Sequence, residues 1–229
     1  MSRGWRSAIW LGAVAFLGWR ASACSSNSGG PAPDFAVSVD TPTATTLGTQ
    51  VVLHVHLTST GDSGSVVFSV SGADTSWDVA LPVGPVTLTA NGQKSANVII
   101  AIPSNGVAAP TGHTVTVDAA IGSLHHSAAT SVTIANQFII PLVRGDHFGT
   151  LSTDTVHVNV GTTLTFRNDD TLAHIIHTSG AIAGLPHQST SGGGTIPGGT
   201  YNNTISGTGT DWVSCHTHPG VDSVRVSVP

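Results

Sequence analysis

The chain of 229 residues contains no glutamate, and only 8% of its residues carry a charge. Its 12 acidic residues are all aspartate, and against Lys+Arg 7 they give a formal net charge of -5. Nucleic-acid binding needs a surplus of Lys and Arg on at least one face, so nucleic acid is not expected as a partner. The hydrophobic fraction of 39% is ordinary, so the scarcity of charge does not indicate disorder.

Sulfur is also scarce. The chain has 2 cysteines, Cys24 and Cys215, and Met1 is its single methionine. The two cysteines lie in such different sequence contexts that a disulfide between them is not expected. Because methionine occurs nowhere after position 1, no site in the mature protein can use a thioether ligand.

The chain is rich in residues that favour turns and strands. It contains Gly 27 and Pro 12, together with many Thr, Ser and Val residues. Gly and Pro favour turns, and β-branched residues favour strands over helices. The composition therefore predicts an all-β protein, and the length is enough for two domains of ordinary size.

The N-terminal segment is typical of an export signal. Basic residues precede an apolar run of 12 residues, Ala8 to Trp19, and small residues follow it up to Ala23. Such a run spans about 18 Å as a helix, too short for a bilayer core. Residues 1–23 are therefore expected to be a signal peptide. The stretch before Cys24 resembles the lipobox of bacterial lipoproteins, which implies lipidation of Cys24, and a plain signal peptide is the alternative. Residues 24–33 are rich in Ser, Gly and Pro and predict a flexible tether to a membrane.

Residues 34–136 show six alternating segments separated by Gly, Pro, Asn and Asp clusters, which predicts a β-sandwich. The segments are 35–39, 51–57, 66–70, 98–102, 115–117 and 132–134. Stretches 61–70 and 109–117 resemble bacterial immunoglobulin-like repeats, which implies a spacer or adhesive role. His54 and His56 share one face of a strand, where a solvent-facing polar row is the expected reason for them. His125 and His126 are assigned no function.

Residues 137–229 predict a second β domain, a small Greek-key sandwich or barrel. Its alternating segments are 138–140, 156–160, 163–166, 174–177, 201–205, 212–215 and 224–228. The stretch from Asp211 to Val221 reads DWVSCHTHPGV, and FRNDDTLAH leads up to His174. These motifs resemble the cupredoxin family of plastocyanin-like and amicyanin-like blue copper proteins. The resemblance implies one type 1 copper ion held by His174, Cys215 and His218.

The chemistry of these residues supports the same metal. A thiolate is soft and imidazole is borderline, so two His and one Cys favour copper over magnesium or calcium. Zinc stays open as an alternative, although it prefers a fourth strong ligand or a bound water. A buried inert thiol is the other interpretation of Cys215.

The chain departs from the cupredoxin pattern in three ways. Val221 stands where the family has its axial Met, so the expected copper is nearly three-coordinate and its potential is raised. Ile175 follows the first His, which leaves backbone NH groups or Asn168 to support the thiolate. Three further histidines, His177, His187 and His216, are candidate extra ligands.

The expected function is a one-electron carrier that is not an enzyme and that docks an unidentified redox protein near His218. The N-terminal segment places it outside the cytoplasm, in a bacterial cell envelope, periplasmic or on the outer surface, and lipid-anchored through Cys24. A copper-binding or delivery protein and an adhesive or structural surface lipoprotein with a vestigial copper site are the alternatives. Copper enzymes commonly place His on both sides of the cysteine or just before it, whereas Ser214 precedes Cys215.

Overall fold

The structure, a computed structural model, describes residues 32–145, 148, 151, 155–218 and 222–229. The predicted signal peptide, Cys24 and most of the predicted tether lie outside these residues. Within the described residues, regular structure is almost entirely β-strand, with a short 3-10 helix, η2, at Thr190–Gly192. The all-β prediction is therefore confirmed. No helix in this described part has the length and apolar character that crossing a membrane requires.

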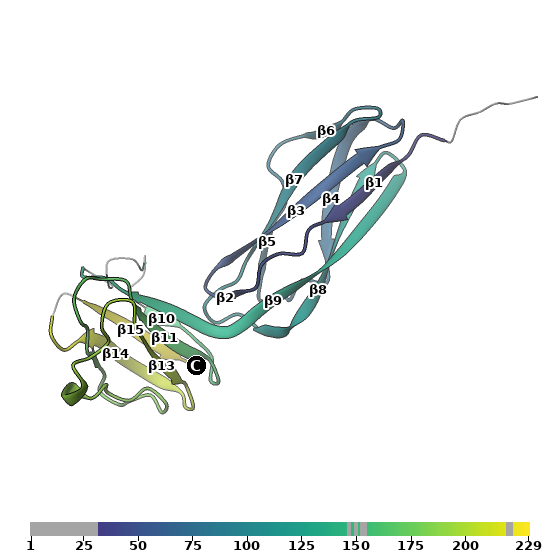
Figure 1. Cartoon of the computed structure of the whole chain (residues 1–229). Helices are drawn as coiled ribbons and strands as arrows, with labels where there is room; N and C mark the ends of the chain where they lie inside the picture. Colours follow the sequence, from purple (N-terminus) through teal and green to yellow (C-terminus); the bar gives the residue numbers. More distant parts are fainter. Residues whose placement is uncertain (1–31, 146–147, 149–150, 152–154, 219–221) are drawn as a thin grey trace, which may run out of the picture. The chain divides into compact units, whose positions relative to one another are not determined.

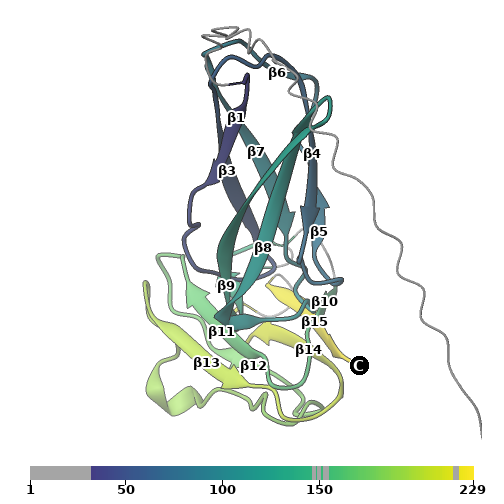
Figure 2. The ribbon, with the colours of Figure 1, turned by 90° about the vertical axis from the view of Figure 1, so that its right-hand side faces the viewer.

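The first part of the chain builds two layers of strands. One layer is a sheet of order β1-β3-β7-β5, with β1 at Phe35–Val39, β3 at Gln50–Ser59, β7 at Gln93–Ala101 and β5 at Asp78–Ala80. The other contains β4 (Gly64–Ser71), β6 (Val86–Leu88), β8 (Ala109–Ile121) and β9 (Leu124–Leu142), with β2 (Thr45–Leu47) paired to β9. Figures 1 and 2 show the two layers from directions at right angles.

Period-two alternation gives this part its core. In β3 the side chains of Val51, Leu53, Val55 and Leu57 are buried, and each contributes about 1.5–3 kcal/mol by leaving water. His54 and His56 lie on the opposite face, as expected. Their ring nitrogens lie at hydrogen-bond distance from neighbouring polar groups rather than from each other: Asn97 for His54, and Ser95 and Asp40 for His56. This pair therefore belongs to a polar outer face.

The second part of the chain contains the strands that hold the candidate site. One row of strands runs β13-β11-β9, with β13 at Thr200–Thr204 and β11 at Thr163–Asn168. The other sheet has the order β10-β15-β14-β12, with β10 at Thr155–His157, β15 at Ser223–Val228, β14 at Gly209–Cys215 and β12 at Ile176–His177. Figure 1 shows β14 and β15 side by side, and their register pairs Ser214 with Ser223.

Strand β9 belongs to both parts. Residues from Leu124 to Ile134 pair with β8, and residues from Gln137 to Leu142 pair in parallel with β11. The predicted boundary between 136 and 137 therefore falls inside a continuous strand. The division into two domains and the immunoglobulin-like character of residues 34–136 stay predictions.

Candidate metal centre

Cys215 and Asp222 lie at the two ends of the loop that joins β14 to β15. Alternate residues of β14 point inward, so Asp211, Val213 and Cys215 are buried and Cys215 ends the strand facing the core. The Cys215 N–H donates to the Asp222 carbonyl across 2.9 Å and closes the base of the loop. The loop therefore brings the thiol and the carboxyl group to the same side of the sheet.

His174 lies between β11 and β12 and is held by its backbone. It forms an isolated β-bridge with Thr195, with hydrogen bonds in both directions of 3.1 and 2.7 Å. The Asn168 amide donates to the carbonyls of Leu172 and Thr195, at 2.7 and 2.6 Å. Asn168 therefore ties together the two segments around His174, and both of these contacts are to carbonyl oxygens rather than to the thiol that the sequence led us to expect.

Glycine is required where these segments meet. Gly194 has a φ of 78°, a left-handed conformation that side chains rarely adopt. A Cβ on Gly194 would collide with the His174 carbonyl oxygen and with the Ile175 side chain. The absence of a side chain at Gly194 therefore lets the Thr195 segment approach the His174 backbone.

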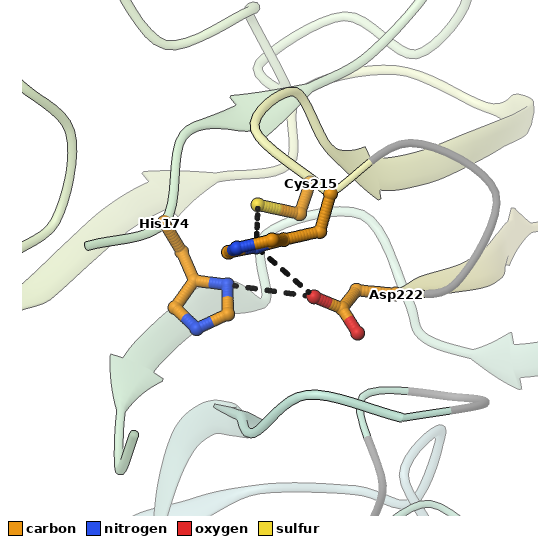
Figure 3. Close-up of side chains that lie close together, drawn as sticks. His174, Cys215 and Asp222 are labelled. Carbon is orange, nitrogen blue, oxygen red and sulfur yellow. Dashed lines mark hydrogen bonds and ion pairs between the residues drawn. The ribbon is translucent and has the colours of Figure 1, made fainter. Parts of the chain in front are cut away.

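Four ligand-type atoms converge at this place. The side-chain donor atoms of His174, Cys215, His218 and Asp222 all lie within 4.8 Å of one another. His218 Nδ1 lies 3.4 Å from Cys215 Sγ and 3.4 Å from Asp222 Oδ2, and His174 Nδ1 lies 3.8 Å from the same oxygen. Figure 3 shows His174, Cys215 and Asp222 pointing toward one another.

Two of these atoms are buried polar groups without a hydrogen-bond partner. They are His174 Nδ1 and Asp222 Oδ2, and both side chains are 0% exposed. Leaving a buried polar atom unpaired costs about 1–3 kcal/mol, and more for a charged group, so such atoms need a physical reason. A metal ion is a sufficient reason, because its bonds would satisfy both.

The spacing fits a metal ion. Bonds of about 2.0–2.3 Å from one ion to tetrahedral N, O and S ligands put the ligand atoms about 3.3–3.6 Å apart. The two 3.4 Å separations around His218 Nδ1 fall in that range, and the 3.8 Å separation is slightly longer. The donor set of one thiolate, two imidazoles and one carboxylate suits copper or zinc rather than magnesium or calcium.

Asp170 fixes which nitrogen of His174 faces this group. A hydrogen bond from the Thr171 backbone N–H lowers the pKa of Asp170, and its contact with His174 acts in the same direction. An ionised carboxylate only accepts hydrogen bonds, so His174 Nε2 donates to Asp170 Oδ2 across 3.2 Å. With Nε2–H committed to Asp170, Nδ1 is the ring nitrogen that faces Asp222 Oδ2, and it would be the atom that binds a metal ion.

A backbone hydrogen bond orients the Asp222 carboxylate, as Asp170 orients the His174 ring. Its Oδ1 accepts a hydrogen bond of 2.7 Å from the Gly145 backbone N–H, which leaves Oδ2 facing the two imidazoles. The thiol side of the group has a contact of its own, since the Thr217 hydroxyl lies 3.0 Å from Cys215 Sγ. The carboxylate and the thiol therefore approach the group from opposite ends of one loop.

The structure brings His174, Cys215 and His218 together, as the sequence motifs suggested, and it adds Asp222. The three candidate extra ligands lie elsewhere, because His177, His187 and His216 form a separate exposed group. Val221, the predicted axial position, lies outside the described residues, and its role stays a prediction.

Sequence reasoning missed both aspartates. Asp222 lies one residue beyond the position that the family pattern marks as axial, so that pattern does not include it. An i, i+4 spacing from His218 is the signal that was available in the sequence. Asp170 has the same spacing from His174, although only the fold shows that it contacts the ring.

The chain matches no protein-family model and no curated protein. Solved structures of amicyanin resemble part of it. A reduced Cu(I) form of an amicyanin mutant is 20% identical, with a TM-score of 0.33, over 42% of this chain and 84% of that chain. An oxidized amicyanin mutant is 21% identical, with a TM-score of 0.33, over 40% of this chain and 81% of that chain. A TM-score at this level establishes no family, so the assignment of the site rests on its own side chains.

Proposed function

We propose that the chain is a type 1 copper protein that carries single electrons and is not an enzyme. The observation that supports the proposal most is the convergence of two buried atoms that lack a hydrogen-bond partner, His174 Nδ1 and Asp222 Oδ2, on the Cys215 thiol and His218. Copper bound there would supply one-electron redox chemistry. The sequence motif of Cys215 and His218, followed in the sequence by Pro219 and Gly220, favours copper over zinc.

The residues around this group suit electron transfer. Cys215, His174 and Asp222 are 0% exposed, so they exclude water and hold the ligand atoms in place. His218 exposes 23% of its side chain and is the member of the group that reaches solvent. A redox partner would therefore approach over His218, which is where the family pattern also implies docking.

Zinc is the second candidate metal, because Asp222 offers a fourth protein ligand. Structural zinc sites are closed by four protein ligands, and Asp222 completes such a set here. A zinc site would stabilise the fold without redox activity. The metal content of protein purified from its natural host separates the two, because the copper proposal requires copper in excess of zinc.

Redox cycling tests the electron-carrier function. We expect copper-loaded protein to lose its visible absorption on reduction by ascorbate and to recover it on reoxidation, with an unchanged far-ultraviolet circular dichroism spectrum. A copper-delivery protein, the rival class, is expected instead to release the ion or to rearrange when reduced. Loss of copper in a single reduction cycle would therefore contradict the carrier proposal.

We also propose that the protein is exported and anchored to a bacterial membrane by a lipid on Cys24. Support comes from residues 1–24 alone, where a basic start and an apolar run precede a small-residue approach to the cysteine. Mass spectrometry of the mature N-terminus provides the test. An unmodified N-terminus would overturn the lipid anchor and leave the copper proposal untouched.

A further inference from the structure

A second group of metal-ligand side chains lies on the surface of the same part of the chain. His177, His187 and His216 come from three separate segments, and all three are exposed. One ring nitrogen from each lies within 4.8 Å of the other two. Their ring centroids are 4.7, 5.4 and 5.7 Å apart.

We propose that His177, His187 and His216 form a second, solvent-open site for a borderline divalent metal ion such as Zn²⁺, Ni²⁺ or Cu²⁺. Imidazole is the protein ligand that suits this class of ions. Three imidazoles leave coordination positions open, so water or an exogenous ligand can complete the shell. The site is distinct from the buried group of Cys215, although His216 follows Cys215 directly in the chain.

The segments that carry the three histidines are joined by hydrogen bonds at β12 and at the residue before it. The His216 N–H donates to the Ile175 carbonyl across 2.7 Å, and His177 lies in β12 opposite Ser214. Gln188, next to His187, donates its N–H to the Ile176 carbonyl and accepts from the Ile176 N–H through Oε1, at 2.9 and 3.0 Å. The rings therefore project from one hydrogen-bonded framework rather than from independent loops.

A backbone contact leaves one nitrogen of His187 available to a metal. His187 Nδ1 lies 2.6 Å from the Gln188 carbonyl oxygen. Because a carbonyl only accepts, Nδ1 carries the proton and Nε2 keeps the lone pair for a ligand. A backbone carbonyl on the outer nitrogen is the usual way in which a metal-binding histidine is oriented.

One pair of nitrogens in the group has the separation expected of two ligands of one ion. His216 Nδ1 lies 3.5 Å from His177 Nδ1. Two tetrahedral ligands with metal–nitrogen bonds of about 2.0–2.1 Å lie about 3.4 Å apart. The alternative is three exposed rings that pack edge to face without an ion, as the interplanar angles of 87° and 75° around His187 allow.

Zn²⁺ binding to the full chain tests the proposal in a background where the buried group is disabled. In the double variant Cys215→Ser and His174→Ala, we expect equilibrium dialysis to detect one Zn²⁺ per chain. Adding His187→Ala should weaken this binding by about tenfold or more, because one of three ligands is lost. His125→Ala, which removes an exposed histidine on β9, is the matched control and should leave the affinity unchanged. Since the buried group lacks its thiol and one imidazole throughout, failure here leaves the copper proposal standing.

A second measurement guards against a variant that does not fold. In the wild-type chain, the ring resonances of His177, His187 and His216 should shift together in NMR spectra when Zn²⁺ exceeds one equivalent, while those of His54 and His125 stay in place. Equal Zn²⁺ affinity in the His187→Ala and His125→Ala variants would overturn the proposal. Ring shifts spread evenly over all histidines would overturn it as well.

Discussion

At the scale of single residues, the charge of the candidate copper site depends on Cys215 and Asp222. A thiolate and a carboxylate carry two negative charges, which balance a divalent ion and overcompensate a monovalent one. Asp222 is 0% exposed, so water screens this difference poorly. The carboxylate should therefore favour the oxidised state, which opposes the rise in potential that a missing axial Met predicts.

Asp222→Asn should raise the reduction potential, because the amide keeps the shape of the side chain and removes its charge. A change of 59 mV corresponds to about 1.4 kcal/mol for a one-electron couple, and we expect a rise on the order of 50–150 mV. Redox titration of the variant and the wild type measures this rise in potential. Asp78→Asn, which neutralises an exposed acid on β5, is the control. A potential equal to the wild type or lower, with copper still bound, would show that the carboxylate does not contact the metal.

Asp170 is a positioning residue for His174. Asp170→Ala removes the acceptor for His174 Nε2–H and should weaken copper binding by about 10–100-fold, as loss of such a contact does in other metal sites. Competition with a chelator of known affinity measures the change.

The neighbouring Asp169 supplies the control for that experiment. It pairs with Arg167 through hydrogen bonds of 2.8 and 2.7 Å, which lower the pKa of Asp169. The pair is exposed, so Asp169→Ala should cost less than about 1 kcal/mol of stability and leave copper affinity unchanged. Similar losses of copper affinity in the two variants would remove the case for a specific role of Asp170.

At the scale of elements, the site depends on how closely the Thr195 segment approaches His174. Gly194→Ala places a methyl group against the His174 carbonyl oxygen and should lower both the melting temperature and the copper affinity. Gly193→Ala separates the effect of the steric collision from the conformational cost of placing a side chain at a positive φ. Gly193 also has a positive φ, 74°, but a Cβ there meets no neighbour within 4 Å, so it carries only the conformational cost of about 1–2 kcal/mol. Equal effects of the two variants on copper affinity would contradict the account of this contact.

The sequence predicted the long strands well and the short ones poorly. All six alternating segments of residues 34–136 overlap observed strands of five or more residues, in which period-two burial has room to appear, although 115–117 and 132–134 cover only part of β8 and β9. Strands β2, β5 and β6 have three residues each, too few for alternation to appear. The predicted strand at 174–177 is reduced to Ile176–His177, since His174 pairs with Thr195 in a single bridge instead.

The candidate site was also predictable only in part. The spacing of Cys215 and His218 within one loop made them predictable, and a family pattern supplied His174. Asp222 and Asp170 were not predictable, because their importance comes from which side chains the folded loops bring near them. An aspartate in a loop is ordinarily solvated, and only burial distinguishes Asp222.

At the scale of the whole molecule, metal binding should stabilise the fold. Within the candidate site, His174 Nδ1 and Asp222 Oδ2 are buried and lack hydrogen-bond partners, and an ion that bonds to them does so only in the native state. An ion at about 100 times its dissociation constant stabilises the native state by about 2.7 kcal/mol. Thermal unfolding with and without copper measures this gain. A melting temperature that copper leaves unchanged in the wild type, or raises equally in Cys215→Ser, would argue against a preformed site.

The most direct test is the visible absorption spectrum of the copper-loaded full chain beside that of Cys215→Ser. We expect an intense thiolate-to-copper charge-transfer band in the wild-type protein, because the Cys215 sulfur would bond to the ion. In Cys215→Ser we expect the band to disappear while the far-ultraviolet circular dichroism of a β protein is retained. A wild-type protein that binds copper without this band, or a Cys215→Ser variant that keeps it, would contradict the assignment of a copper centre at His174, Cys215, His218 and Asp222.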